Sequence, residues 1–182
     1  MKRSVLTVVA TVVLAASLNA SEKQARADNG IAKDIMRLLK AAGAVAYAHK
    51  TPYGGGIDSL YIGYGSNDHP VVGLAVRDTK TYKQALAIIA VTPDQEGYKI
   101  SAAEIPDVGT FRGKSQTLTR NALKDITGKV FKDEKDARGL VDAVTGATQY
   151  YKAIYVSYAQ MASKVIEELS ARPDWPRTPI NP

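Results

Sequence analysis

Between residues 44 and 103, short apolar segments alternate with turn sequences, and this alternation limits the fold more than any other feature of the chain. Glycine and proline mark the turns, most clearly in PYGGG at residues 52–56. The segment 85–91 fits a strand or a buried helix by periodicity, but its β-branched residues and its Thr and Pro neighbours favour a strand. Four or five meandering strands are predicted, within residues 44–49, 59–63, 71–76, 85–91 and 98–103.

Three helices are predicted around these strands. Asn29 is a good N-cap for the first helix, in which apolar residues recur at helical spacing until Gly43. A second helix starts near residue 115 and closes at Gly128, and a charged loop is expected over residues 132–140. The last helix, 150–169, carries an apolar stripe of Tyr151, Ile154, Tyr158, Met161, Val165 and Leu169. This order predicts a single α+β domain, whose largely antiparallel sheet is packed by the N-terminal and C-terminal helices.

The first twenty residues have the pattern of a secretory signal peptide. Lys2 and Arg3 precede an apolar run that is too short to span a membrane, and small residues follow it. Cleavage after Ala20 fits the distance from the apolar run, whereas cleavage after Ala27 fits the small-x-small pattern better, and both stay open. The alternative is an uncleaved anchor. We expect export to a periplasm or the cell exterior, with no transmembrane segment in the mature chain.

The residues beyond this leader, which is placed at 1–20, divide into a domain and a tail. The domain is expected over residues 28–170, and residues 171–182 are rich in proline and predict an extended tail on the surface. The net charge of +6 is spread along the chain without a run of like charge. This distribution predicts a solvated surface, and we expect no nucleic-acid partner.

Cysteine is absent, and the only histidines are His49 and His69. The chain therefore has no disulfide, thiolate metal site, iron–sulfur cluster or C-x-x-C-H haem attachment, and it does not supply a multi-histidine metal site. Both histidines flank turns, and the carboxylate pair Asp133 and Glu134 lies in the charged loop. No Ser-His-Asp set is evident, so we assign no catalytic residue and no metal ligand. Any redox cofactor must then be organic.

One segment carries recognisable chemistry, the sequence DAVTGAT at residues 142–148. Gly146 and Ala147 let the backbone approach a ligand closely, and the hydroxyls of Thr145 and Thr148 flank them. A long predicted helix follows at once, so its free N–H groups and its positive dipole end favour a phosphate here. The structural alternative is that Thr148 merely caps this helix.

This segment resembles the flavinylation motif, roughly D-x-x-S/T-G-A-T, of the FMN-binding domain family. That family includes flavin subunits of the sodium-pumping NADH:quinone reductase and of the Rnf complex, and small exported proteins. The resemblance implies that Thr148 bears FMN through a phosphoester, installed by a flavin transferase that uses FAD as donor and a divalent metal ion. By the same resemblance, Asp142, Thr145, Gly146 and Ala147 form the recognition segment around the acceptor. The glycine-rich stretch from Tyr53 to Val76 also resembles the family's hairpin and strand.

The chain departs from the family after that strand. Members of the membrane complexes usually carry E-T-P-G-hydrophobic-G there, whereas residues 77–81 read RDTKT. The departure suggests a stand-alone carrier, and contacts made there by relatives do not carry over. Lys152 and Arg77 are candidates to stabilise anionic reduced flavin, with ordinary surface charge as the alternative. The rings of Tyr150 and Tyr151 are expected either to contact the flavin or simply to pack.

The sequence thus predicts an exported flavoprotein that relays electrons, with no substrate turnover of its own. Its expected partners are the flavin transferase during maturation, and then membrane dehydrogenases or exported cytochromes. One alternative is a non-redox binding or sensing module that holds a phosphorylated ligand at the TGAT turn. Another is a small flavin-dependent reductase.

Overall fold

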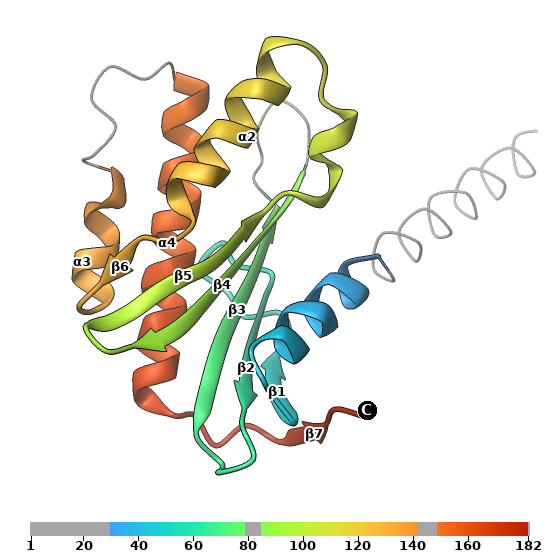
Figure 1. The fold of residues 1–182 in the computed structure, drawn as a ribbon, viewed down its shortest axis with the longest axis vertical. Coiled ribbons are helices and arrows are strands. Elements are labelled where there is room, and N and C mark those ends of the chain that lie inside the picture. Colours follow the sequence, from blue (N-terminus) through green and yellow to red (C-terminus); the bar gives the residue numbers. More distant parts are fainter. Residues whose placement is uncertain (1–29, 79–84, 142–148, 182) are drawn as a thin grey trace, which may run out of the picture. The chain divides into compact units, whose positions relative to one another are not determined.

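The computed structural model describes residues 30–78, 85–141 and 149–181 (Figure 1). The chain divides into two compact units, residues 1–37 and 38–182. In the first unit, the described residues belong to a helix that runs over residues 30–41 and continues into the second unit. The signal peptide predicted at residues 1–20 lies outside the described residues.

The second unit is built on an antiparallel sheet of seven strands in the order β6-β5-β4-β3-β2-β1-β7. Each neighbouring pair is antiparallel, and β1 to β5 follow one another along the chain as a meander. This confirms the predicted α+β class and the strand assignment of residues 85–91. The strands are β1 (Ala46–Lys50), β2 (Ser59–Tyr64), β3 (Pro70–Asp78), β4 (Leu86–Asp94), β5 (Gly97–Glu104), β6 (Val130–Phe131) and β7 (Arg177–Pro179).

The helices of the second unit follow β5 in the chain. Figure 1 shows α2, α3 and α4 together on one side of the sheet. The helix predicted from residue 115 is α2, and Gly128 follows it with φ +89°, as expected of a glycine beyond a helix end. The elements are η1 (Pro106–Thr110), α2 (Lys114–Ile126), α3 (Glu134–Arg138), η2 (Gly139–Val141) and α4 (Gln149–Ala171).

Two glycines let layers approach the two faces of the sheet. A Cβ on Gly73 of β3 would lie 2.4 Å from Val165 Cγ1 of α4. On the opposite face, a Cβ on Gly63 of β2 would lie 2.9 Å from Leu39 Cδ2, in the last turn of the helix over residues 30–41. Both distances are too short for a real side chain, so each glycine permits a close contact between layers.

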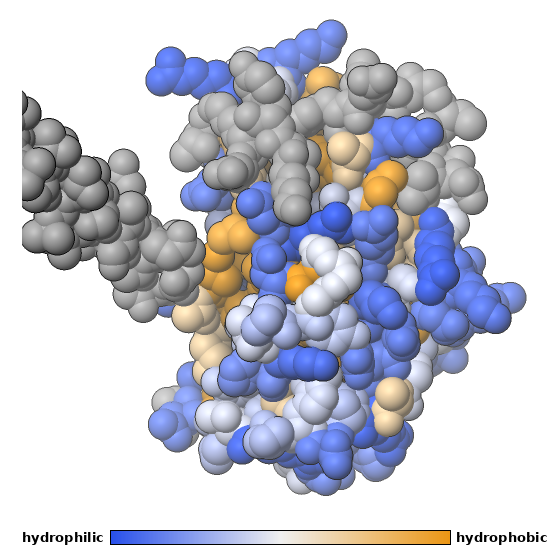
Figure 2. Space-filling model, turned by 180° about the vertical axis from the view of Figure 1, so that it is seen from behind, coloured by the Kyte–Doolittle hydropathy of each residue, from blue (hydrophilic) through white to orange (hydrophobic). Residues whose placement is uncertain are grey.

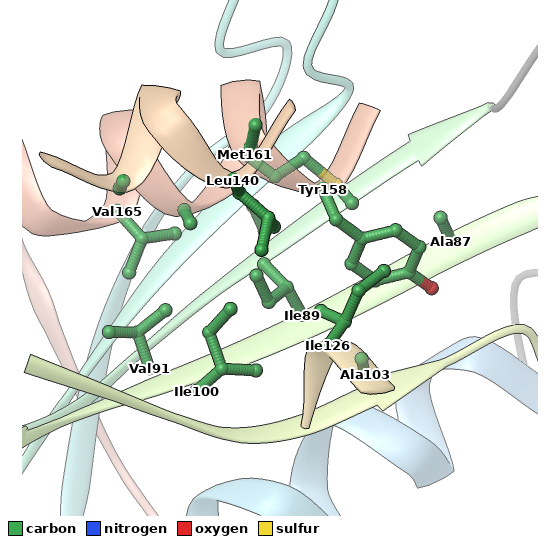
Figure 3. Close-up of a cluster of buried hydrophobic side chains, with 14 of the residues drawn as sticks. Ala87, Ile89, Val91, Ile100, Ala103, Ile126, Leu140, Tyr158, Met161 and Val165 are labelled. Carbon is green, nitrogen blue, oxygen red and sulfur yellow. The ribbon is translucent and has the colours of Figure 1, made fainter. Parts of the chain in front are cut away.

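The main core lies between the sheet and α4. The described part of the apolar stripe predicted for the last helix is buried, since Ile154, Tyr158, Met161, Val165 and Leu169 are at most 4% exposed. Figure 3 shows Tyr158, Met161 and Val165 gathered with Ile89 and Val91 of β4. The amphipathic pattern therefore predicted correctly which face of this helix is buried.

The C-terminal tail adds a strand that the sequence did not predict. Arg177, Thr178 and Pro179 form β7 and pair with β1 at the edge of the sheet. The Arg177 guanidinium lies 3.9 Å from the centre of the Tyr64 ring, and Trp175 meets Tyr53 edge-on. The tail is extended, as its proline content predicts, and it also covers the backbone groups of β1.

The charged loop predicted at residues 132–140 contains a short helix, α3, so that prediction is wrong in part. The side chain of Asp133 accepts hydrogen bonds from the backbone N–H groups of Lys135 and Asp136 and caps this helix. Asp133 and Glu134 therefore help to form a helix start, which is a structural role.

Candidate functional site

The residues that the sequence assigns to cofactor binding fall in a gap between two described elements. The element before the gap, η2, ends at Val141, and α4 begins at Gln149 directly after it. The long helix expected immediately after the motif is thus confirmed, with 23 residues. Five assigned residues lie outside the described residues: Asp142, Thr145, Gly146, Ala147 and Thr148.

The N-terminal end of α4 is suited to an anion. Any α-helix leaves the N–H groups of its first turn without intrahelical acceptors, and its dipole places partial positive charge there. The first turn of α4 contains no acidic residue, and the side chain of Lys152 is exposed. A phosphate at this end would meet a favourable field that no carboxylate of the first turn opposes.

Two tyrosine hydroxyls fix the first half of α4. Tyr155 donates a hydrogen bond to Asp125 Oδ2 of α2 at 2.5 Å, and Tyr158 donates to the carbonyl oxygen of Glu104 in β5 at 2.7 Å. Burial raises the pKa of the Tyr158 hydroxyl well above its usual range, so this group stays a neutral donor. Together with buried Ile154, these bonds hold the start of the helix against α2 and β5.

The chain before the gap is also anchored on α4. Arg138 Nε donates to Ser163 Oγ at 3.1 Å, and Leu140 is 3% exposed. Leu140 belongs to the same core cluster as Met161 and Ile89 (Figure 3). The described residues before the gap therefore pack on α4, and those after the gap form α4 itself. Sequence reasoning missed both the Arg138 and the Tyr155 contacts, because they depend on tertiary neighbours.

The cations considered for the flavin lie at different places along α4. Arg77 at the end of β3 donates a hydrogen bond to Gln160 Oε1. Gln160 is eleven residues beyond Gln149, which is about 16 Å along a helix axis. Arg77 therefore lies at the middle of α4. Of the two cations considered for the flavin, Lys152 lies near the start of this helix. The side chains of Tyr150 and Tyr151 are outside the described residues.

Neither histidine belongs to a ligand cluster in the described ranges. The ring of His49 stacks on that of Tyr61, with centroids 5.5 Å apart, and His69 is exposed in the turn before β3. In the same ranges, no three His, Cys, Asp or Glu side chains are grouped so that they would hold a metal ion.

No helix among residues 30–78, 85–141 and 149–181 is long and apolar enough to cross a membrane. No protein-family model, curated protein or solved structure matches the chain.

Proposed function

We propose that the chain is an exported flavoprotein that carries FMN covalently on Thr148 and relays electrons between membrane or extracytoplasmic redox partners. The observation that carries this proposal is the start of α4 at Gln149, directly after the last threonine of DAVTGAT. A helix N-terminus without acidic residues in its first turn suits a phosphate held at that position.

The chemistry of the chain also favours an attached organic cofactor. A chain without cysteine and with two histidines offers few ligands to redox metals. An exported protein meets little free flavin, so reversible binding would leave it mostly empty, whereas a phosphoester removes dissociation. The bound flavin would supply the electron-carrying ring.

The attachment step needs one hydroxyl and one activated phosphate. The Thr148 hydroxyl loses its proton and forms a phosphoester to riboflavin phosphate, while AMP leaves from the FAD donor. A flavin transferase with a divalent metal ion supplies the catalysis. The net change in the chain is the addition of FMN with the loss of one water. The hydrogen bonds of Tyr155 and Tyr158 hold the first half of α4, the helix that follows the acceptor, against α2 and β5.

The experiment is the intact mass of the exported chain after co-expression with a flavin transferase. The wild-type chain is expected to gain the mass of FMN minus water and to be yellow, whereas Thr148→Ala is expected to stay unmodified. The matched control is Thr117→Ala, which removes an exposed hydroxyl on α2 and should leave flavinylation intact.

Two results would overturn the attachment. One is a wild-type chain of unmodified mass in an experiment where the same transferase flavinylates a second protein as positive control. The other is a Thr148→Ala chain that carries FMN. For the electron relay, the flavinylated chain is expected to exchange electrons with a cytochrome or a membrane dehydrogenase. Steady turnover of a small acceptor by the purified protein would assign it as a reductase instead.

A further inference from the structure

A pocket of about 340 Å³ opens beside the middle of α4. Its base includes Ile57 and Ser163, which are both 3% exposed. Its volume lies within the range of small-molecule pockets in proteins. The walls come from the turn before β2, the end of α3 and α4, through Gly55, Ile57, Arg138, Gln160, Ser163 and Lys164.

Arg138 lines this pocket, and Arg77 adjoins it through Gln160; both guanidinium groups have neutral partners. Arg138 donates to the hydroxyl of Ser163, and Arg77 donates to the side-chain oxygen of Gln160. Neither arginine takes part in an ion pair with another described residue. A guanidinium carries five N–H donors and no acceptor, so each arginine keeps donors for a further partner.

The other polar groups of the pocket add donors. Gln160 Oε1 accepts a hydrogen bond from Arg77, and Ser163 Oγ accepts one from Arg138. The side-chain NH₂ of Gln160 is a further donor. Lys164 adds a third cation, whose charge is partly offset by Glu167. The pocket therefore combines excess positive charge with an excess of hydrogen-bond donors.

A turn of three glycines contributes Gly55 to the wall of this pocket. Gly54, Gly55 and Gly56 all have positive φ, and a Cβ on Gly55 would meet no atom within 4 Å. A Cβ on Gly56 would lie 3.5 Å from Arg77 Nη2, so the Arg77 guanidinium lies against this turn.

We propose that this pocket binds a small organic anion through a carboxylate or phosphate group. Arginine forks match the oxygens of both groups with paired, charge-assisted hydrogen bonds. Figure 2 shows the molecule from behind, where hydrophilic side chains predominate over the described surface. The inference is independent of flavin attachment, because its residues lie outside the segment 142–148.

The test uses the unflavinylated chain, produced without the transferase. Inorganic phosphate and succinate are titrated separately into labelled protein, at an ionic strength held constant with sodium chloride. We expect saturable shifts of the backbone amide signals of Gly55 and Ser163 with at least one of them. Saturation by phosphate alone would assign the phosphate group, and saturation by succinate alone would assign the carboxylate.

Variants separate the pocket from general surface charge. Arg138→Gln is expected to weaken binding by about tenfold, because it removes charge-assisted hydrogen bonds. The control Arg120→Gln, at an exposed arginine of α2, is expected to change the affinity by less than about twofold. If Arg138→Gln fails to fold, as judged by its thermal transition, Lys164→Gln replaces it with the same direction of effect.

Three results would overturn the pocket. The first is the absence of saturation by both anions, and the second is an equal loss of affinity in Arg120→Gln. The third is the same set of amide shifts with sodium chloride alone. Flavinylation does not enter any of these measurements, so the failure of this proposal and that of covalent FMN attachment are distinguishable.

Discussion

The hydroxyl of Tyr155 lies 2.5 Å from Asp125 Oδ2, and this hydrogen bond joins the first half of α4 to the last turn of α2. Tyr155 is 4% exposed, whereas the carboxylate of Asp125 is largely exposed and also faces Lys129 Nζ at 3.8 Å. The Tyr155 ring is thus buried, and its hydroxyl meets a carboxylate that lies at the surface. The contact ties α4 to α2 six residues beyond Gln149, where α4 begins.

Tyr155→Phe should lower the free energy of unfolding by about 1 kcal/mol, because it removes a hydrogen bond to a charged group that water then solvates. Urea denaturation measures this change. Tyr61→Phe is the matched control, since it removes a hydroxyl from a partly exposed ring on β2. Equal losses in the two variants would mean that the Tyr155 hydroxyl contributes nothing specific.

Gly73→Ala should destabilise the protein by about 1–3 kcal/mol, because the new methyl overpacks the contact between β3 and α4. Its Cβ would lie 2.4 Å from Val165 Cγ1 and 3.1 Å from Leu169 Cγ. Thermal or urea denaturation measures the loss. Gly109→Ala is the control, because a Cβ at that glycine meets no atom within 4 Å and its φ is not positive.

A second substitution tests the cause of that loss. Val165→Ala removes the atom closest to the new methyl, so Gly73→Ala and Val165→Ala together should cost less than the sum of the two single changes. Simple additivity of the two free energies would contradict overpacking at this contact. Backbone strain at residue 73 would then be the better explanation.

The sequence predicted those parts of the fold that local patterns determine. The apolar stripe of α4, the turn between β2 and β3 and the turn between β4 and β5 were visible because each is set by neighbours in the chain. The strand β7 was not, because it has only three residues, follows Pro176 and includes Pro179, and it pairs with a strand about 130 positions earlier. The start of α3 had a local signal, since Asp133 is a good N-cap, but five residues are too few for a clear helical period.

The candidate site was predictable to a smaller extent. The motif placed a phosphate-favouring turn before a long helix, and the helix begins where expected. The residues that hold that helix were not predictable, because Tyr155 and Asp125 are 30 positions apart and meet only after α2 packs on α4. The same applies to Arg77 and Gln160, which are 83 positions apart. The pocket beside Gln160 is a product of the tertiary fold.

The stability of the protein should fall in alkaline solution, partly through Tyr53. Burial and the hydrogen bond that its hydroxyl donates to Glu168 raise the pKa of Tyr53 well above its ordinary value of 10.0. The folded state therefore keeps this proton more tightly than the unfolded state. The stabilisation is complete below pH 10 and is lost as the pH rises from there towards the higher folded pKa.

Tyr53→Phe tests this pH dependence. The free energy of unfolding of the variant should decline less steeply above pH 10 than that of the wild type. The buried hydroxyl of Tyr158, whose pKa is also raised, acts in both proteins. Tyr47→Phe, at a partly exposed ring of β1, serves as the control for the loss of a phenol hydroxyl. Identical slopes for Tyr53→Phe and the wild type would contradict the role of Tyr53.

Asp133 should protect the first turn of α3 from hydrogen exchange. Its side chain accepts hydrogen bonds from the backbone N–H groups of Lys135 and Asp136. These bonds lower the pKa of Asp133 below its ordinary value of 3.8, and the bond from Asp136 has the largest effect. Asp133→Ala should therefore speed exchange at these two amides, while Asp133→Asn, which keeps an acceptor oxygen, should retain most of the protection.

The protection is complete above pH 3.8 and is lost as the pH falls through the folded pKa, because the protonated carboxyl is a weaker acceptor. Amide exchange followed by NMR gives both comparisons. Unchanged exchange at residues 135 and 136 in Asp133→Ala would show that the first turn of α3 does not depend on this cap.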